Sequence, residues 1–319
     1  MSALDTGTTR GSTVQGATTG VRLFLRAHGE ARQPGQPVVI LEAGLGVSGA
    51  HWGAVQRILG EIPSYSYDRA GYGQSPATRR PRRATNMAAE LLDALRTAGI
   101  HPPYVVVGHS YGGILAREFM AAAGYEAIQG AVLVEANQEG SHAKLQNPLA
   151  AFAALAGPVS YTEAVGLARQ NAFTAAEQAE IALDESVATA VTTMKREADG
   201  MLDSARELGE KKQLDTQRLS MSPLTVIRGD TSRDINVLLE HGCNGGHGTR
   251  SDVAQVHDFL QRFHTHDRDL QLQQLQLSCV SRCVQAEKSG HFVPATEPEL
   301  IARELCSILA TIESFHHDT

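Results

Sequence analysis

The sequence predicts an α/β protein that has a doubly wound, mostly parallel sheet and a helical insertion. Strand-like and helix-like segments alternate over residues 21–137, an order typical of parallel sheets with right-handed crossovers. The strand pattern stops over residues 138–220 and returns at residues 224–230. An apolar run that passes through Gly-x-Ser-x-Gly into a helix lies at the centre of this order, at residues 104–120.

The segments before that motif follow one another as expected for such a sheet. Residues 1–20 are rich in Ser, Thr and Gly, and we expect a disordered or loosely ordered tail there, not a signal peptide. Asn86 is a candidate N-cap for a helix that ends near Arg96. The other expected elements are an antiparallel edge strand at 21–27, a buried strand at 38–41, a helix at 51–59 and a strand at 64–68.

The central motif has the context of a nucleophile elbow. Four apolar residues, Tyr104–Val107, precede Gly108-His109-Ser110-Tyr111-Gly112, and a helical pattern follows. A short apolar run of this kind is typical of a strand buried on both faces. Glycines on either side of Ser110 permit a sharp turn in which the serine is strained and its hydroxyl is exposed. We therefore take Ser110 as the candidate nucleophile.

The chain after the motif alternates again, apart from one helical segment. Residues 138–220 favour helices, with capping patterns at Ser160 and Thr174 and a long helix from about 175 to 208 that is broken near Gly200. We expect this segment to be a lid that shapes a substrate pocket. The two flanking parts, 21–137 and 221–319, form the expected core. Its later elements are strands at 131–137, 224–230 and 278–286, an amphipathic helix from 251, and a helix that Thr296 caps and that ends near 312.

Composition excludes several classes of function. The chain has 319 residues, 42% of them hydrophobic, and a net charge of −7. That charge is spread along the chain, so neither nucleic acid nor a membrane surface is an expected partner. The sequence does not determine the oligomeric state, and a homodimer is one option. The polar loop that contains Arg79, Arg80, Arg82 and Arg83 is expected to be solvated.

Cysteine and histidine clusters do not indicate a metal site. All four cysteines lie in the last quarter of the chain, and reduced thiols in a cytoplasmic protein are the expected state. Residues 241–247 contain two histidines and a cysteine, but no further ligand stands at a definite spacing. We expect a flexible glycine-rich loop there. The segment with His264, His266 and Asp267 is expected to be a solvated polar stretch.

The elbow and its flanking segments resemble the α/β-hydrolase superfamily, over roughly residues 20–135 and 220–312. The resemblance is closest to the branch of small-molecule esterases, lactonases and carbon–carbon-bond hydrolases. It implies an oxyanion hole formed by the backbone N–H groups of Leu45 and Tyr111. It also implies that His291, in a Ser-Gly-His turn after the last strand, is the catalytic base.

The acid of the implied triad is left open between three carboxylates. The superfamily usually places it as Gly-x-x-Asp after the penultimate strand, but here Gly229 is followed directly by Asp230, and Asp234 comes later. The other position follows the strand after the elbow helix, where Glu135 stands. Zearalenone-type lactonases are similar in using a glutamate there. We favour Glu135, with Asp230 as the alternative and Asp234 after it.

The resemblance implies a serine hydrolase that acts on a medium-sized, hydrophobic small molecule. Ser110 would attack an ester, lactone or activated ketone, and no metal or organic cofactor would be required. Two other functions remain open at this point. Relatives with the same residues catalyse condensation, cyclisation or acyl transfer in biosynthesis, and others are ligand receptors on the same fold.

Overall fold

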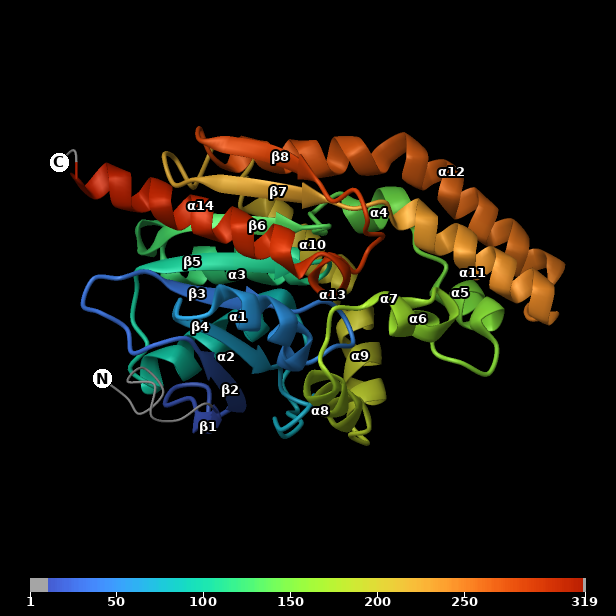
Figure 1. The fold of residues 1–319 in the computed structure, drawn as a ribbon, viewed down its shortest axis with the longest axis horizontal. Helices are drawn as coiled ribbons and strands as arrows, with labels where there is room; N and C mark the ends of the chain where they lie inside the picture. Colours follow the sequence, from blue (N-terminus) through green and yellow to red (C-terminus); the bar gives the residue numbers. More distant parts are fainter. Residues whose placement is uncertain (1–10, 318–319) are drawn as a thin grey trace.

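An eight-stranded sheet forms the centre of the protein, in a computed structural model that describes residues 11–317 (Figure 1). Its order is β1-β2-β4-β3-β5-β6-β7-β8. β3 to β8 are mutually parallel, whereas β1 and β2 are antiparallel to their neighbours. The predicted fold class is therefore confirmed. The strands are β1 (Gly11–Gln15), β2 (Arg22–His28), β3 (Val38–Glu42), β4 (Ser64–Asp68), β5 (Tyr104–His109), β6 (Ile128–Val134), β7 (Leu224–Arg228) and β8 (Ser281–Gln285).

Helices cover both faces of this sheet. Side chains of α2 and α3 join one hydrophobic cluster, and those of α1 and α14 join a second cluster on the opposite face. Figure 1 shows α14 lying across the sheet in front of β5 and β6. The helices that belong to this core, with three short 3₁₀ turns, are η1 (Gly49–Trp52), α1 (Gly53–Leu59), α2 (Ala84–Thr97), α3 (Gly112–Ala123), η2 (Tyr125–Ala127), η3 (Gln274–Leu277), α13 (Val293–Thr296) and α14 (Pro298–His317).

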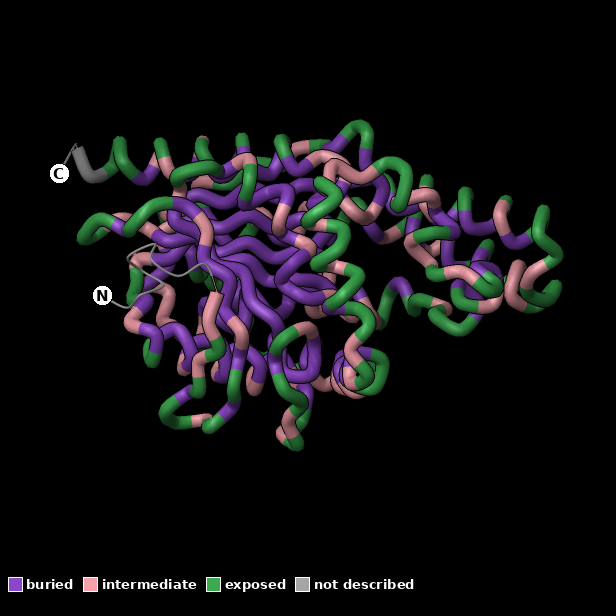
Figure 2. Tube along the Cα trace, turned by 60° about the horizontal axis from the view of Figure 1, so that its bottom comes forward, coloured by how far each residue is buried: buried purple, intermediate pink, exposed green. Residues whose placement is uncertain are grey.

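The central strands are apolar at successive positions because both of their faces are covered. Val38 and Ile40 of β3 lie in the cluster with α2 and α3, whereas Val39 and Leu41 lie in the cluster with α1 and α14. Successive side chains of a strand point to opposite faces, so a strand between two helical layers needs no polar residue. Figure 2 shows the central strands of the sheet buried and the outer helix surfaces exposed.

The prediction of a loose tail over residues 1–20 is wrong for residues 11–20. β1 forms a five-residue antiparallel pair with β2, which is thus an inner strand and not the expected edge. The turn that follows is tied to α2, because the Asp93 carboxylate accepts the backbone N–H of Thr19 at 2.6 Å. Residues 1–10, the remainder of the predicted tail, lie outside the described residues.

The segment between β6 and β7 is helical, as expected, and the predicted break near Gly200 separates α9 from α10. The predicted long helix is also interrupted at residues 186–189, which was not expected. Thr174 forms a full capping box with Glu177 at the start of α8. The helices of this insertion are α4 (Ser141–Leu145), α5 (Leu149–Ala156), α6 (Tyr161–Ala164), α7 (Leu167–Gln170), α8 (Ala175–Glu185), α9 (Ala190–Asp199) and α10 (Met201–Glu210).

A second helical segment lies between β7 and β8, and only part of it was predicted. It consists of α11 (Thr231–Gly245) and α12 (Arg250–Gln273), which extend beyond the sheet beside α5 and α6 (Figure 1). The expected flexible loop at 241–247 is mostly the last turn of α11. Apolar residues of α5, including Phe152 and Leu155, are buried against α11 and α12. These side chains hold the helices together.

Two predicted helix starts are displaced. α2 begins at Ala84 after Arg83, so Asn86 is inside the helix and its side chain donates to the carbonyl of Pro81 at 3.0 Å. Thr296 is the last residue of α13, and α14 starts at Pro298. Among the helices of the described residues, none combines the length and the apolar character needed to cross a bilayer.

Candidate active site

Ser110 lies at the turn between β5 and α3, and its backbone is in the left-handed region, with φ of 56°. This conformation is unfavourable for a residue with a side chain. Hydrogen bonds to the end of β6 hold it, since the Ser110 N–H donates to Val134 O at 3.1 Å and the Asn137 N–H donates to Ser110 O at 2.8 Å. The turn is also closely packed, because a Cβ at Gly108 would lie 2.5 Å from the Gly112 carbonyl oxygen.

The structure brings His291 to Ser110. His291 lies in the loop between β8 and α13, and its Nε2 is 2.9 Å from Ser110 Oγ. Asn137 Oδ1 is a more distant neighbour of the same hydroxyl, at 3.5 Å. Both Ser110 and His291 are partly exposed. The hydroxyl is therefore within hydrogen-bond reach of a base and accessible from outside.

Glu135 is the carboxylate that the structure places beside the other ring nitrogen. Its Oε2 is 3.6 Å from His291 Nδ1, and its side chain is buried. Its Oε1 accepts the backbone N–H of Gly229, at the end of β7, at 2.7 Å. Glu135 follows β6 with φ of 44°, so a second strained residue stands beside the elbow.

Thr231 lies between this carboxylate and the histidine, and the sequence analysis missed it. Its hydroxyl is 2.6 Å from Glu135 Oε2 and 3.3 Å from His291 Nδ1. It is the first residue of α11. No motif marks a threonine at this position, and its contacts depend on three strand ends that meet at one edge of the sheet.

The two alternative acids lie nearby but in different roles. The Asp230 carboxylate accepts the hydroxyl of Ser232, and no hydrogen bond or ion pair joins it to His291 within the described residues. Asp234 Oδ2 accepts the backbone N–H of His291 at 2.7 Å. Burial raises the pKa of the Asp234 carboxyl, while the His291 backbone N–H lowers it. Asp234 therefore holds the loop, and Glu135 is the carboxylate that lies at the imidazole.

His109, the residue before Ser110, contacts the loop that contains His291. Its Nε2 is 2.8 Å from the carbonyl oxygen of His291, so this nitrogen carries the proton and donates. Burial, followed by the nearby His291, lowers the pKa of His109 to about 3. His109 is thus a neutral hydrogen-bond donor and not a second base.

Two backbone N–H groups are candidates to face the serine. Tyr111 is the N-cap of α3, so its N–H has no acceptor within the helix. Gly44, which precedes Leu45, approaches closely, since a Cβ there would lie 3.3 Å from Ser110 Cβ. Helix α9 borders this turn, because a Cβ at Gly46 would lie 2.9 Å from Met194 Sδ.

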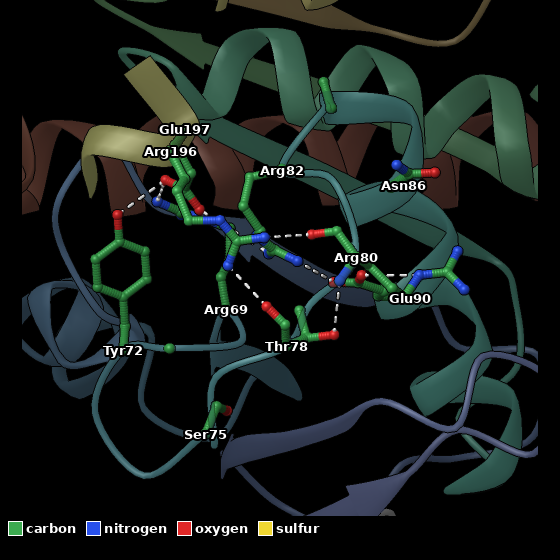
Figure 3. A network of polar contacts seen from close by, with 12 residues as sticks. Arg69, Tyr72, Ser75, Thr78, Arg80, Arg82, Asn86, Glu90, Arg196 and Glu197 are labelled. Atoms are coloured by element: carbon green, nitrogen blue, oxygen red, sulfur yellow. Dashed lines mark hydrogen bonds and ion pairs between the residues drawn. The ribbon is translucent and has the colours of Figure 1, made fainter. Parts of the chain in front are cut away.

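A buried polar network lies on the other side of the turn (Figure 3). Arg69 donates to the carbonyl oxygens of Ala43 and Gly44 at 2.9 and 2.7 Å, and it forms an ion pair with Glu197 of α9. The expectation of a solvated arginine loop is wrong for Arg82, which is buried and donates to Glu90 at 2.8 Å. The network joins the insertion to the turn that contains Leu45.

One residue of the polar stretch at His264, His266 and Asp267 is buried, contrary to expectation. Asp267 is buried and forms an ion pair with Arg228 at 2.9 Å, so that part of the polar stretch is structural. Each of the four cysteines is free. Among residues 11–317, no group of three or more His, Cys, Asp or Glu side chains is arranged to hold a metal ion.

The arrangement contains what nucleophilic acyl transfer needs. The Ser110 hydroxyl is hydrogen-bonded to the His291 imidazole, and the buried Glu135 carboxylate lies beside the other ring nitrogen. Backbone N–H groups are available near the hydroxyl. A base can take the hydroxyl proton during attack, and N–H groups can stabilise a developing oxyanion.

Comparison with known proteins gives one matching family. The profile described as "Alpha/beta hydrolase family" matches residues 38–304. A protein of Gibberella zeae named "AB hydrolase superfamily protein" is 38% identical over 301 residues, covering 91% of this chain and 92% of the relative. A protein of Hormonema carpetanum named "Probable transporter efuK" is 31% identical over 92% of this chain, which spans only 42% of that relative's length.

Solved structures show the same fold. A thermophilic esterase from Thermogutta terrifontis superposes with a TM-score of 0.59, and 95% of this chain and 99% of that chain are covered. Its sequence identity is 16%, so the likeness concerns the fold alone.

Proposed function

The chain belongs to the alpha/beta hydrolase family, and we propose that it is a serine hydrolase that cleaves an ester, lactone or activated carbonyl bond through an acyl-enzyme. The observation that carries the proposal is the 2.9 Å contact between Ser110 Oγ and His291 Nε2 at a strained strand-to-helix turn. A serine hydroxyl is a weak nucleophile without a base at that distance.

In the first half of the reaction, Ser110 attacks the substrate carbonyl while its proton passes to His291 Nε2. The Leu45 and Tyr111 N–H groups stabilise the tetrahedral oxyanion. The imidazolium then gives its proton to the leaving group, and an ester of Ser110 remains. Glu135 stabilises the imidazolium through its negative charge.

In the second half, water replaces the leaving group. His291 takes a proton from this water, which attacks the acyl carbon, and the proton then returns to Ser110. The scheme uses only side chains of this chain, backbone N–H groups and water. The partly exposed positions of Ser110 and His291 support access for water and substrate.

Apolar groups around the site support a medium-sized, hydrophobic substrate. Met194 adjoins the turn at Gly46 and is 40% exposed, and Val191, one turn earlier on α9, is 71% exposed. Phe292 adjoins the histidine, with ring centroids 5.5 Å apart. Exposed apolar side chains beside a reactive centre are typical of a ligand-binding surface. The helical insertion acts as the lid in this proposal.

A fluorophosphonate probe with an aryl-ester assay tests the proposal. The wild-type protein is expected to be labelled at Ser110, and Ser110→Ala to lose labelling together with roughly 10⁴- to 10⁶-fold in turnover. Ser251→Ala, which changes an exposed serine on α12, is the matched control and should retain both. Normal turnover of Ser110→Ala would reject the proposal. Product analysis with added alcohols or thiols separates hydrolysis from acyl transfer, because transfer yields a new ester in place of the acid.

A further inference from the structure

We propose that Thr231 is a positioning residue through which Glu135 acts on His291. This inference rests on the proposed function and adds a fourth member to its triad. The relay runs from Ser110 to His291, then to the Thr231 hydroxyl, and finally to Glu135.

The distances favour an indirect link between the acid and the histidine. Glu135 Oε2 is 3.6 Å from His291 Nδ1, which is too long for a direct side-chain hydrogen bond. The other oxygen, Oε1, already accepts the Gly229 N–H at 2.7 Å. Thr231 Oγ1 is 2.6 Å from Oε2 and 3.3 Å from Nδ1, so it lies closer to each of these two atoms than they lie to each other.

The direction of these bonds follows from the proton count. A hydroxyl has one proton, and an ionised carboxylate can only accept. The Thr231 proton therefore lies on the 2.6 Å bond to Glu135. Thr231 Oγ1 can then only accept from His291, which requires the proton of the neutral ring to be on Nδ1. In that tautomer Nε2 is unprotonated and can take the proton of Ser110.

The position of Thr231 is set by the fold. It is the first residue of α11 and is buried at 9% exposure, directly after the β7 end that donates Gly229 N–H to Glu135. Its side chain therefore has little freedom to leave the relay. When the ring becomes an imidazolium, the oriented hydroxyl and the carboxylate behind it stabilise the new charge.

The test compares Thr231→Val, which keeps the shape but loses the hydroxyl, with Thr231→Ser, which keeps the hydroxyl. Thr231→Val is expected to lower kcat roughly 10- to 100-fold with little change in KM. Thr231→Ser should remain within a few-fold of wild type. Thr225→Val, at a buried threonine of β7, is the matched control and should leave kcat unchanged. Thermal unfolding shows whether each variant is folded.

A double-mutant cycle supplies a readout that a purely structural role would not move. If Thr231 acts through Glu135, Thr231→Val should cost much less in a Glu135→Gln background than alone. Equal losses in both backgrounds, normal kcat of Thr231→Val, or equal damage by Val and Ser would overturn the inference. Retained activity of Ser110→Ala would instead reject the proposed function itself, so the two failures are distinguishable.

A second inference comes from the buried network in Figure 3: we infer that Arg69 positions the peptide that presents the Leu45 N–H, and that Glu197 of α9 positions Arg69. This also rests on the proposed function. Arg69 Nη2 donates to Gly44 O at 2.7 Å. That carbonyl belongs to the same planar peptide unit as the Leu45 N–H, and the two groups point in opposite directions.

The bond from Arg69 therefore has two effects on the Leu45 N–H. It fixes the peptide plane, because Nη1 also donates to Ala43 O at 2.9 Å and so holds two successive carbonyls. It also polarises the peptide, since a cation bound to the carbonyl oxygen makes the N–H of the same peptide unit a stronger donor. Both effects would favour an oxyanion over a neutral carbonyl oxygen.

Glu197 holds the guanidinium from the insertion. Its carboxylate accepts Arg69 Nε and Nη2, each at 2.9 Å, and the Tyr72 hydroxyl at 3.0 Å. Arg69 and Glu197 are 1% and 0% exposed. The paired, planar contact leaves one orientation for Arg69. The position of α9 is thus transmitted to the oxyanion turn.

The test replaces the pair as a unit, since removal of one partner would leave an unpaired buried charge. Arg69→Met/Glu197→Met is expected to lower kcat and the affinity for an aryl boronic acid by the same factor, roughly 10- to 100-fold. KM for the ester should change little. Lys211→Met/Glu118→Met removes a 2.9 Å ion pair outside this network and is the matched control, with both quantities expected within about threefold of wild type.

Boronic-acid affinity that stays at the wild-type value in the folded double variant would overturn this inference. If the double variant does not fold, Arg69→Lys gives the test instead, because it keeps a cation beside Glu197 but lacks the planar fork that holds both carbonyls and the carboxylate at once. It should weaken boronate binding several-fold, and unchanged binding would again reject the inference.

Discussion

Replacement of Glu135 by glutamine tests the choice of acid most directly. The change keeps the side-chain volume and an oxygen for the Gly229 N–H, but it removes the negative charge 3.6 Å from His291 Nδ1. At an effective dielectric constant of about 20, two unit charges at that separation interact by about 5 kcal/mol. Loss of this term from the transition state, where the imidazolium forms, lowers kcat roughly 10³-fold.

The assay is ester hydrolysis over a range of pH, with Asp230→Asn and Asp234→Asn measured beside Glu135→Gln. Glu135→Gln should show the largest loss of kcat of the three variants, because Glu135 is the carboxylate beside the imidazole ring. Asp230→Asn should be nearly normal, since its carboxylate is bonded to Ser232. Asp234→Asn should cost about tenfold or less, because an amide oxygen still accepts the His291 N–H.

Near-normal turnover of Glu135→Gln would refute this reasoning. A large loss in Asp230→Asn with little loss in Glu135→Gln would assign the acid to the end of β7 instead. Thermal unfolding of each variant at the assay pH separates an effect on chemistry from an effect on folding.

The remaining predictions concern stability. Burial raises the pKa of Glu42 from 4.5 to about 7, although the hydrogen bond from the Tyr67 hydroxyl lowers it. The folded state therefore binds the proton more tightly than the unfolded state, and the free energy of unfolding falls as pH rises from 4.5 to about 7. Glu42→Gln should abolish this fall and raise Tm at pH 8 but not at pH 4, and identical Tm shifts at both would contradict it. His109, whose pKa is depressed to about 3, has the opposite sign: stability falls as pH drops from 6.5 toward 3, and His109→Gln should flatten that part of a denaturant-derived stability profile. Gly108→Ala should destabilise the protein by about 1–3 kcal/mol in urea unfolding, because the new methyl meets the Gly112 carbonyl; an unchanged midpoint would show that the elbow can relax.

Local pattern was sufficient for most of the sheet. The apolar runs at Val38–Leu41 and Tyr104–Val107 mark strands buried on both faces, and the structure confirms both. β1 was missed because four of its five residues are glycine or polar, and the strand buries only part of its surface. The start of α11 was missed because Gly229 and Asp230 favour a turn reading, while its later glycines favour a loop.

Residue patterns along the chain predicted the family, the order of the strands, and the candidates Ser110 and His291, because each depends on neighbours within a few residues. The tertiary structure was needed to show that Glu135, and not Asp230, lies beside the imidazole, that Thr231 lies between Glu135 and His291, and that Arg69 reaches the Gly44 carbonyl. These contacts join residues from separate strand ends and from the insertion. Hydrogen-bond distances of about 3 Å are set by sheet register and helix packing, and residue type and spacing along the chain do not specify them.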